Sequence, residues 1–257
     1  MKIGEQLLLA LSRRPGTGDY ATTTSEYNLQ NALNFPRKTV PNFDQKIEGK
    51  HVLDYGCGPG WQAVAMKTQC GAASVLGVDI NERWLSAGRA LADQEQCSSS
   101  VQFARSVDKS RIGTFDVVVS ISSFEHFAKP EDNLAEMATL VKPGGMVIVT
   151  FAEPWYSHSG AHMVFFTKVP WVNVWFSEST VLNVRSRFRD DGATRYEEVE
   201  GGLNRMTLKK FEQIMFSSGM KVEYLKYHST KNLPLVDKVP VVREFLVSAA
   251  VCILRRM

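Results

Sequence analysis

The chain has 257 residues, of which 44% are hydrophobic and 22% charged, and its formal net charge at pH 7 is +3. This composition is typical of an ordinary globular protein and excludes low-complexity and repetitive chains. The small charge forms no basic stripe with interleaved aromatic residues, which argues against nucleic acid as a partner and leaves small anionic substrates open. A chain of this length can hold one α/β domain with a sizeable core, and we expect a single domain over residues 1–257.

Residues 1–47 are predicted to form helices and loops ahead of the first strand. The apolar run after Lys2 is interrupted by Glu5, and no small-residue cleavage signal follows it, so a helix is favoured over an export peptide. The apolar tail at 245–254 has ten residues, about half the length that spans a bilayer. We therefore expect no membrane span.

Strand-like and helix-like patterns alternate through residues 48–152. Strands are predicted at about 50–55, 74–79, 101–103, 115–120 and 146–151, and helices at 61–69, from Asn81 onward and at 130–141. The run FDVVVS at 115–120 is almost continuously apolar, as in a strand that is buried on both faces. The alternation predicts a doubly wound, mostly parallel sheet whose ligand crevice lies beyond the carboxyl ends of the strands.

The alternation breaks down in residues 153–205, which are rich in aromatic side chains and arginine. We expect this insert to form a lid over the crevice, because large flat side chains exclude water and hold organic acceptors. Packing of its aromatic residues against the N-terminal helices is the alternative. The candidate substrate-binding residues are Trp155 and Tyr156 in the insert and Tyr20 and Tyr27 in the N-terminal segment.

Three arginines, Arg185, Arg187 and Arg189, alternate within the insert. On an extended strand they would share one face and could hold a carboxylate or a phosphate. Acidic residues follow closely, among them Asp190 and Asp191, so a solvated ion-pair network is the favoured interpretation.

The most informative segment is DYGCGPG at 54–60, which supplies a carboxylate and then three glycines at every second position, directly after a strand. Glycine allows a sharp turn and a close approach of the backbone to a ligand. The spacing G-x-G-x-G differs from the G-x-G-x-x-G of dinucleotide-binding turns, so a nucleoside without pyrophosphate fits better, and a dinucleotide oxidoreductase is the rival interpretation. Asp79, about twenty residues beyond the turn, is placed to accept hydrogen bonds from ribose hydroxyls.

Several motifs occur in a familiar order: VLDYGCGPG at 52–60, GVDI at 77–80, FDVVVS at 115–120, FEHF at 124–127 and KPGG at 142–145. This ordered set resembles the class I S-adenosylmethionine-dependent methyltransferases, closely over about 48–152 and loosely over the last fifty residues. The resemblance implies a seven-stranded sheet that ends in an antiparallel hairpin, S-adenosylmethionine as cofactor, and methyl transfer to a small or medium-sized organic acceptor. It also implies four parts: an N-terminal cap at 1–47, a cofactor-binding core at 48–152, a lid at 153–205, and a last helix with the closing hairpin at 206–257.

The same resemblance implies roles for individual residues. The glycines let the loop approach the cofactor, Asp54 helps to hold its amino group directly or through water, and Asp79 binds the ribose. An acidic residue commonly follows the third strand in this family, whereas here Ser106, or Asp108 as a substitute, stands near the adenine amino group. The candidate cofactor-binding residues are Asp54, Gly56, Cys57, Gly58, Asp79, Ile80 against the adenine face, Ser106, and Ser120 and Ile121 near the methionine part.

Three histidines are candidate catalytic residues, because an oxygen acceptor of high pKa must lose a proton as it reacts and histidine is suited to receive it. His126 follows the fourth strand and acts as a base or in a positioning role, while His158 and His162 come from the insert. No third ligand accompanies that pair and Gly160 disfavours a helix between them, so no metal site is expected. Glu153 is a weaker candidate base.

The functional interpretation is therefore a cytoplasmic methyltransferase with reduced cysteines that acts on a small-molecule acceptor, with oxygen slightly favoured over nitrogen or carbon. One alternative is a family member that uses the cofactor for another reaction. Another is a cofactor-binding partner subunit without turnover of its own. The sequence leaves a homo-oligomer open.

Overall fold

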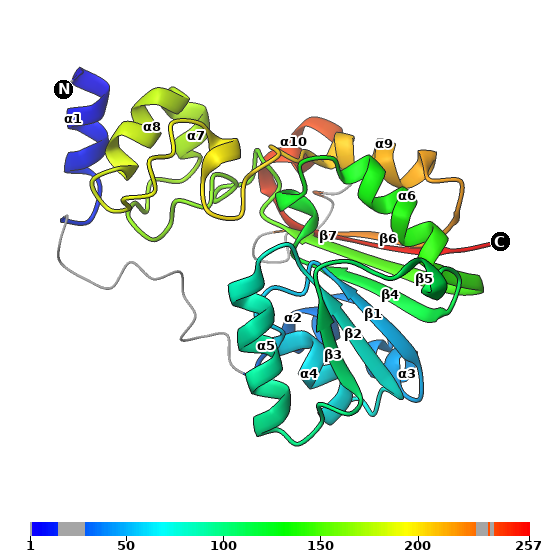
Figure 1. Ribbon diagram of the computed structural model, residues 1–257. Coiled ribbons are helices and arrows are strands. Elements are labelled where there is room, and N and C mark those ends of the chain that lie inside the picture. The colour runs from blue at the N-terminus through cyan, green and yellow to red at the C-terminus, as the bar shows by residue number, and fades with distance from the viewer. Residues whose placement is uncertain (1, 15–28, 230–235, 237–238) are drawn as a thin grey trace.

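The computed structural model describes residues 2–14, 29–229, 236 and 239–257, and Tyr20 and Tyr27 lie outside them. The described part of the chain contains a seven-stranded sheet in the order β3-β2-β1-β4-β5-β7-β6 (Figure 1). β7 runs antiparallel to both of its neighbours, and the remaining pairs are parallel. This confirms the predicted doubly wound sheet with an antiparallel closing hairpin. The strands are β1 His51–Tyr55, β2 Ser74–Val78, β3 Val101–Ala104, β4 Phe115–Ile121, β5 Val141–Ala152, β6 Lys221–Ser229 and β7 Val247–Arg255.

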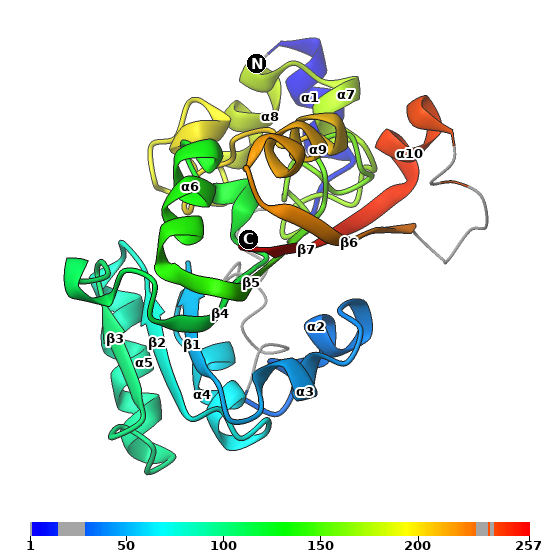
Figure 2. The same cartoon turned by 90° about the vertical axis from the view of Figure 1, so that its right-hand side faces the viewer.

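Helices cover both faces of the sheet (Figures 1 and 2). On one face lie α2 (Asn34–Thr39), α3 (Phe43–Ile47), α4 (Trp61–Thr68) and α5 (Glu82–Gln94). On the other face lie α6 (Pro130–Leu140), α9 (Leu208–Ser217) and α10 (Pro240–Leu246). Each layer has its own apolar core, so the central strands are buried on both sides, as the continuous apolar run of β4 requires.

Local sequence signals fix several element ends. The side chain of Asn81 accepts hydrogen bonds from the backbone of Arg83 and Trp84 at the start of α5, where a helix was predicted. Thr207 accepts one from Lys210 at the start of α9. The predicted helix at 130–141 is one residue too long, because Val141 already pairs with Phe115. β5 therefore begins before the KPGG turn, which lies opposite an irregularity in the pairing with β4.

A separate lobe contains the insert and the first helix. It holds α1 (Ile3–Ala10), α7 (Val172–Trp175) and α8 (Glu178–Arg185), and Figures 1 and 2 show these helices side by side. Leu8 of α1 is fully buried in the same apolar core as Phe166 and Tyr196 of the insert. The 1–47 segment is thus divided, since α1 packs on the insert whereas α2 and α3 pack on the sheet.

The arginines of the insert do not lie on an extended strand, so that interpretation is wrong. Arg185 is the last residue of α8, where turning backbone replaces the alternating geometry. Its guanidinium donates to both carboxylate oxygens of Asp191 at 2.6 and 2.5 Å, which lowers the pKa of that carboxyl to about 2. The favoured interpretation is thus right about the ion pair but wrong about its solvation, because Arg185 is buried. No helix in the described part of the chain has the length and apolar character needed to cross a membrane.

Candidate active site

The glycine turn folds back onto the end of β2. The backbone N–H groups of Gly56 and Cys57 both donate to the carbonyl of Val78, each at 2.9 Å. Gly56 and Gly58 have φ values of +80° and +52°, a region that side chains disfavour. A Cβ atom on Gly56 would come within 2.8 Å of Ser123, whereas one on Gly58 would meet only Trp84, at 3.9 Å. Gly56 is therefore required by packing, whereas Gly58 has room for a Cβ atom, which would lie at van der Waals distance from Trp84.

These two glycines should respond differently to alanine. We expect Gly56→Ala to lower the melting temperature strongly, because a positive φ that costs roughly 1–2 kcal/mol is combined with the clash against Ser123. Gly58→Ala should carry only the backbone cost and yet weaken S-adenosylhomocysteine binding at least tenfold. Thermal denaturation and calorimetric titration of both variants separate the two effects, and equal loss of stability in both would contradict this assignment.

Asp79 stands at the end of β2 and holds the turn. One carboxylate oxygen accepts from the backbone N–H of Gly58 at 2.9 Å and the other from Asn81 at 2.8 Å. Each oxygen keeps a further lone pair, which suits a pair of ribose hydroxyls. Ile80, the next residue, is 84% exposed, so an apolar surface that a ligand can contact lies beside this carboxylate.

Asp54, the last-but-one residue of β1, is fully buried, and neither of its carboxyl oxygens has a hydrogen-bond partner within the described ranges. Burial raises its pKa to about 7, and the negative charge of Asp79 contributes. The hydroxyl of Ser120, on the neighbouring strand β4, is also buried without a described partner. A buried, unpaired carboxyl next to a glycine turn is suited to receive a cationic amino group, directly or through water.

The raised pKa of Asp54 predicts a pH dependence of stability. The folded state binds this proton more tightly than the unfolded state, so the free energy of unfolding falls as pH rises through about 7. Between pH 5.5 and 8, wild type should lose about 2 kcal/mol that Asp54→Asn retains. Chemical denaturation at the two pH values checks this difference. Glu125, whose pKa is also near 7, lowers the free energy of unfolding of both proteins equally and so cancels in the comparison. If the free energy of unfolding changed with pH by the same amount in wild type and in Asp54→Asn, the raised pKa of Asp54 would be disproved.

The loop after β3 carries the remaining cofactor candidate. Ser106 is exposed at this loop. Asp108 is engaged in capping the short helix η1 (Lys109–Arg111), because its carboxylate accepts from the backbone N–H of Ser110 at 2.8 Å and from its hydroxyl at 2.6 Å. Of these two residues, Ser106 has the less engaged side chain.

His126 lies in the short helix η2 (Phe124–His126), just after β4. The hydroxyl of Ser123 donates to the carbonyl of Gly56 at 2.9 Å, which ties η2 to the glycine turn. Nδ1 of His126 is 2.7 Å from the carbonyl oxygen of Gly202. Because a carbonyl only accepts, Nδ1 carries the proton, and Nε2 of the neutral ring is left as an acceptor. The ring is therefore held in the tautomer that a general base needs.

The structure brings His162 to His126, with ring centroids 5.4 Å apart and the rings nearly perpendicular. Burial, with a contribution from His126, lowers the pKa of His162 to about 3, so this ring stays neutral at physiological pH. Its Nε2 atom is 3.6 Å from the carboxylate of Glu153, whose pKa is raised by burial. His158 is exposed, and the described contacts do not join it to the other two rings.

Glu125 is a further member of this site that sequence reasoning missed. It is buried, one carboxyl oxygen accepts from the backbone of Ala152 at 3.3 Å, and burial raises its pKa to about 7. A cavity of about 10 Å³, enough for roughly one water, adjoins Glu125, Glu153 and His162. The acid next to the histidine in FEHF was the available signal, but its burial depends on the insert that covers it.

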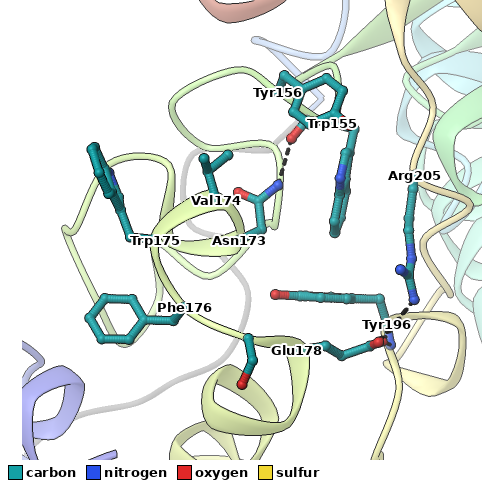
Figure 3. Close-up of a pocket in the computed structure, with 10 residues that line it drawn as sticks. Trp155, Tyr156, Asn173, Val174, Trp175, Phe176, Glu178, Tyr196 and Arg205 are labelled. Carbon is teal, nitrogen blue, oxygen red and sulfur yellow. Dashed lines mark hydrogen bonds and ion pairs between the residues drawn. The ribbon is translucent and has the colours of Figure 1, made fainter. Parts of the chain in front are cut away.

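A larger open pocket of about 510 Å³ lies in the insert lobe (Figure 3). Trp155 and Tyr156, two of the candidate substrate-binding residues, line it. Its other lining residues are Asn173, Val174, Trp175, Phe176, Ser177, Glu178, Tyr196 and Arg205. The volume is in the range of small-molecule sites.

The donor set fits S-adenosylmethionine. Asp79 offers free lone pairs to a ribose, exposed Ile80 offers an apolar face to adenine, and the unpaired carboxyl of Asp54 suits the amino group. In the described ranges, no cluster of three or more histidine, cysteine, aspartate or glutamate side chains is arranged to hold a metal ion.

Comparisons with known proteins identify the family of the chain. The family model of a methyltransferase domain matches residues 27–225. The chain is 35% identical over 105 residues to a ubiquinone biosynthesis O-methyltransferase of Acinetobacter baylyi, covering 39% of this chain and 43% of that protein. It is 31% identical over 128 residues to the protein of the same name from Coxiella burnetii, covering 46% of this chain and 53% of that protein. The chain thus spans about half the length of these curated relatives.

Solved structures show the same fold. An S-adenosylmethionine-dependent methyltransferase from Mesorhizobium loti superposes with a TM-score of 0.57 at 18% identity, covering 89% of this chain and all of that one. The [4+2]-cyclase SpnF also gives a TM-score of 0.57, at 15% identity, over 93% of this chain and 84% of its own. Fold, turn, acidic residues and family model together show that the chain belongs to the class I S-adenosylmethionine-dependent methyltransferases.

Proposed function

We propose that this protein transfers the methyl group of S-adenosylmethionine to an oxygen atom of a small or medium-sized organic acceptor. The observation that carries the choice of oxygen is the fixed tautomer of His126, which leaves Nε2 as a proton acceptor in a helix that Ser123 ties to the glycine turn. The relatives named O-methyltransferases support the same choice, although they match only part of the chain.

The residues of the chain divide the work between holding the cofactor and moving a proton. Asp79 binds the ribose hydroxyls, Asp54 holds the amino group, and Ser120 and Ile121 contact the methionine part. The cofactor supplies an electrophilic methyl group on a good leaving group when it is bound. Alignment of the acceptor oxygen then accounts for much of the rate, because orientation of this kind supplies up to roughly 7–11 kcal/mol.

Nε2 of His126 receives the acceptor proton. The resulting imidazolium is stabilised by the Gly202 carbonyl at Nδ1 and by the buried carboxyl of Glu125, which interacts electrostatically with this histidine. His162 remains neutral beside it, and together with Glu153 it closes the cavity against bulk water.

Incubation with S-adenosylmethionine labelled in its methyl group tests this function. A panel of catechols, phenols, amines and carbon acids is offered, and we expect label in a methyl ether. Label on nitrogen or carbon would overturn the oxygen assignment. Cofactor binding without labelled product from any acceptor would favour a partner subunit, and an unlabelled product would indicate another reaction.

The proposal extends to the cellular location of the protein and to its partners. We place the protein in the cytoplasm, because its four buried cysteines form no disulfide. Its partner in this proposal is a small-molecule acceptor and not a nucleic acid. A homo-oligomer is compatible with this function.

A further inference from the structure

We propose that the pocket of the insert lobe, lined by Trp155, Asn173, Tyr196 and their neighbours, binds a neutral aromatic ring that carries a hydroxyl group. The volume of about 510 Å³ is ample for one or two fused rings. The assignment of this ring to the methyl acceptor rests on the proposed function, whereas binding of the ring by the pocket does not.

The walls favour a flat apolar ring. Trp155 and Tyr196 pack edge to face with centroids 4.9 Å apart, and Figure 3 shows both rings facing the pocket. Among its lining residues, Trp175 is 70% exposed and Val174 is 45% exposed, so the pocket opens onto apolar surface. Tyr156 continues this apolar rim toward Phe245 of α10, at a centroid distance of 5.6 Å. Aromatic rings stack well on such surfaces.

Two buried polar atoms point to a hydroxyl on that ring. Tyr196 is 1% exposed, and its hydroxyl has no hydrogen-bond partner among the residues that the structure describes. The side-chain oxygen of Asn173 is likewise unpaired with any described group, while its amide nitrogen donates to the Trp155 carbonyl at 2.7 Å. Both residues line the pocket (Figure 3). A ligand hydroxyl accepts from the first and donates to the second, which no bare ring or ether can do.

The charges of the pocket argue against an anionic ligand. Arg205 is the cation here, and it is bound by Glu178 at 2.9 Å and by Glu197 at 3.0 Å. Two carboxylates thus surround one guanidinium, so neither a carboxylate nor a phosphate of a ligand finds an uncompensated positive charge. The group that the pocket recognises is therefore not an anion.

The pocket shares a wall with the histidine site. Trp155 and Arg205 line both the large pocket and the small cavity next to His162. A ring bound in the insert thus lies one side chain away from the candidate catalytic residues. The acceptor oxygen that is methylated belongs to a part of the molecule that extends past Trp155.

Calorimetric titration with 7-hydroxycoumarin and with unsubstituted coumarin tests ring binding without any turnover. We expect saturable binding of 7-hydroxycoumarin at least tenfold tighter than that of coumarin, the factor that one buried hydrogen bond of about 1.4 kcal/mol supplies. Tyr196→Phe should reduce this difference, because only the hydrogen bond to Asn173 remains, and should leave coumarin binding unchanged. Tyr224→Phe, a matched change on β6, should alter neither affinity.

The exposed side chain of Trp175 and the cofactor turn provide two further measurements. Trp175→Ala removes an exposed rim residue without threatening the fold and should weaken both probes several-fold. Saturation with S-adenosylhomocysteine should leave the affinity for 7-hydroxycoumarin unchanged, since the pocket is separate from the glycine turn. Mutual exclusion of the two ligands, equal affinity of the two probes, or no saturable binding would overturn the proposal. Once an acceptor is known, an unchanged KM in Tyr196→Phe would show that the pocket does not bind the acceptor. This result does not depend on the outcome of the methyl-label assay.

Discussion

Replacement of Asp79 by asparagine should weaken the binding of S-adenosylhomocysteine by on the order of a hundredfold. The carboxylate keeps one free lone pair on each oxygen after holding the backbone of Gly58 and Asn81. Hydrogen bonds to a charged group contribute roughly 1.5–3 kcal/mol each, and an amide can accept through only one of its two ends. Calorimetric titration measures the loss directly.

The matched control is Asp93→Asn, which removes the same charge from the exposed far end of α5. It should bind S-adenosylhomocysteine like wild type. A melting temperature of Asp79→Asn within a few degrees of wild type would show that the turn still folds. If Asp79→Asn kept wild-type affinity, the ribose assignment would be wrong.

Replacement of His126 by glutamine should lower kcat by roughly a hundredfold to ten-thousandfold, the range that general base catalysis contributes. Glutamine can still donate to the Gly202 carbonyl, so the anchoring of η2 is preserved while the proton acceptor is lost. Affinity for S-adenosylhomocysteine should not change. Steady-state kinetics with the acceptor that the labelling panel identifies, together with titration of the cofactor product, separates these effects.

His162→Gln is the informative comparison. With a pKa near 3, His162 carries no charge at working pH, so its replacement should affect KM more than the shape of the pH profile. His126→Gln should instead lower kcat, because the proton acceptor is lost. A large fall of kcat in His162→Gln with wild-type rates in His126→Gln would reverse the two roles.

The fold was predictable where the signal is local. Asn81 and Thr207 each cap a helix through their own next residues, and the apolar run of β4 reflects burial by its immediate neighbours. The KPGG turn misled because glycine and proline indicate a break, whereas Val141 ahead of the turn pairs with Phe115 across the sheet. Pairing between strands depends on distant residues, and a window of sequence does not contain them.

The candidate site also has some contacts that are local in sequence and others that depend on distant residues. The glycine turn and Asp79 belong to one strand-turn-helix-strand unit, so their proximity could be predicted from sequence. The approach of His162 to His126 depends on where the insert lies, and so does the burial of Glu125. Likewise, Tyr196 gave no sign in the sequence that its hydroxyl would lie unpaired among the described residues.

The position of α1 bears on how the protein is made and handled. Glu5 accepts a hydrogen bond from Asn183 at 3.0 Å, and the backbone of Arg13 donates to Phe166 at 2.8 Å, so the earliest part of the chain finds its partners more than 150 residues later. During synthesis, β1 to β5 leave the ribosome before the insert against which this helix packs. Deleting residues 1–13, or crowding them with a purification tag, should therefore harm acceptor use and spare nucleoside affinity.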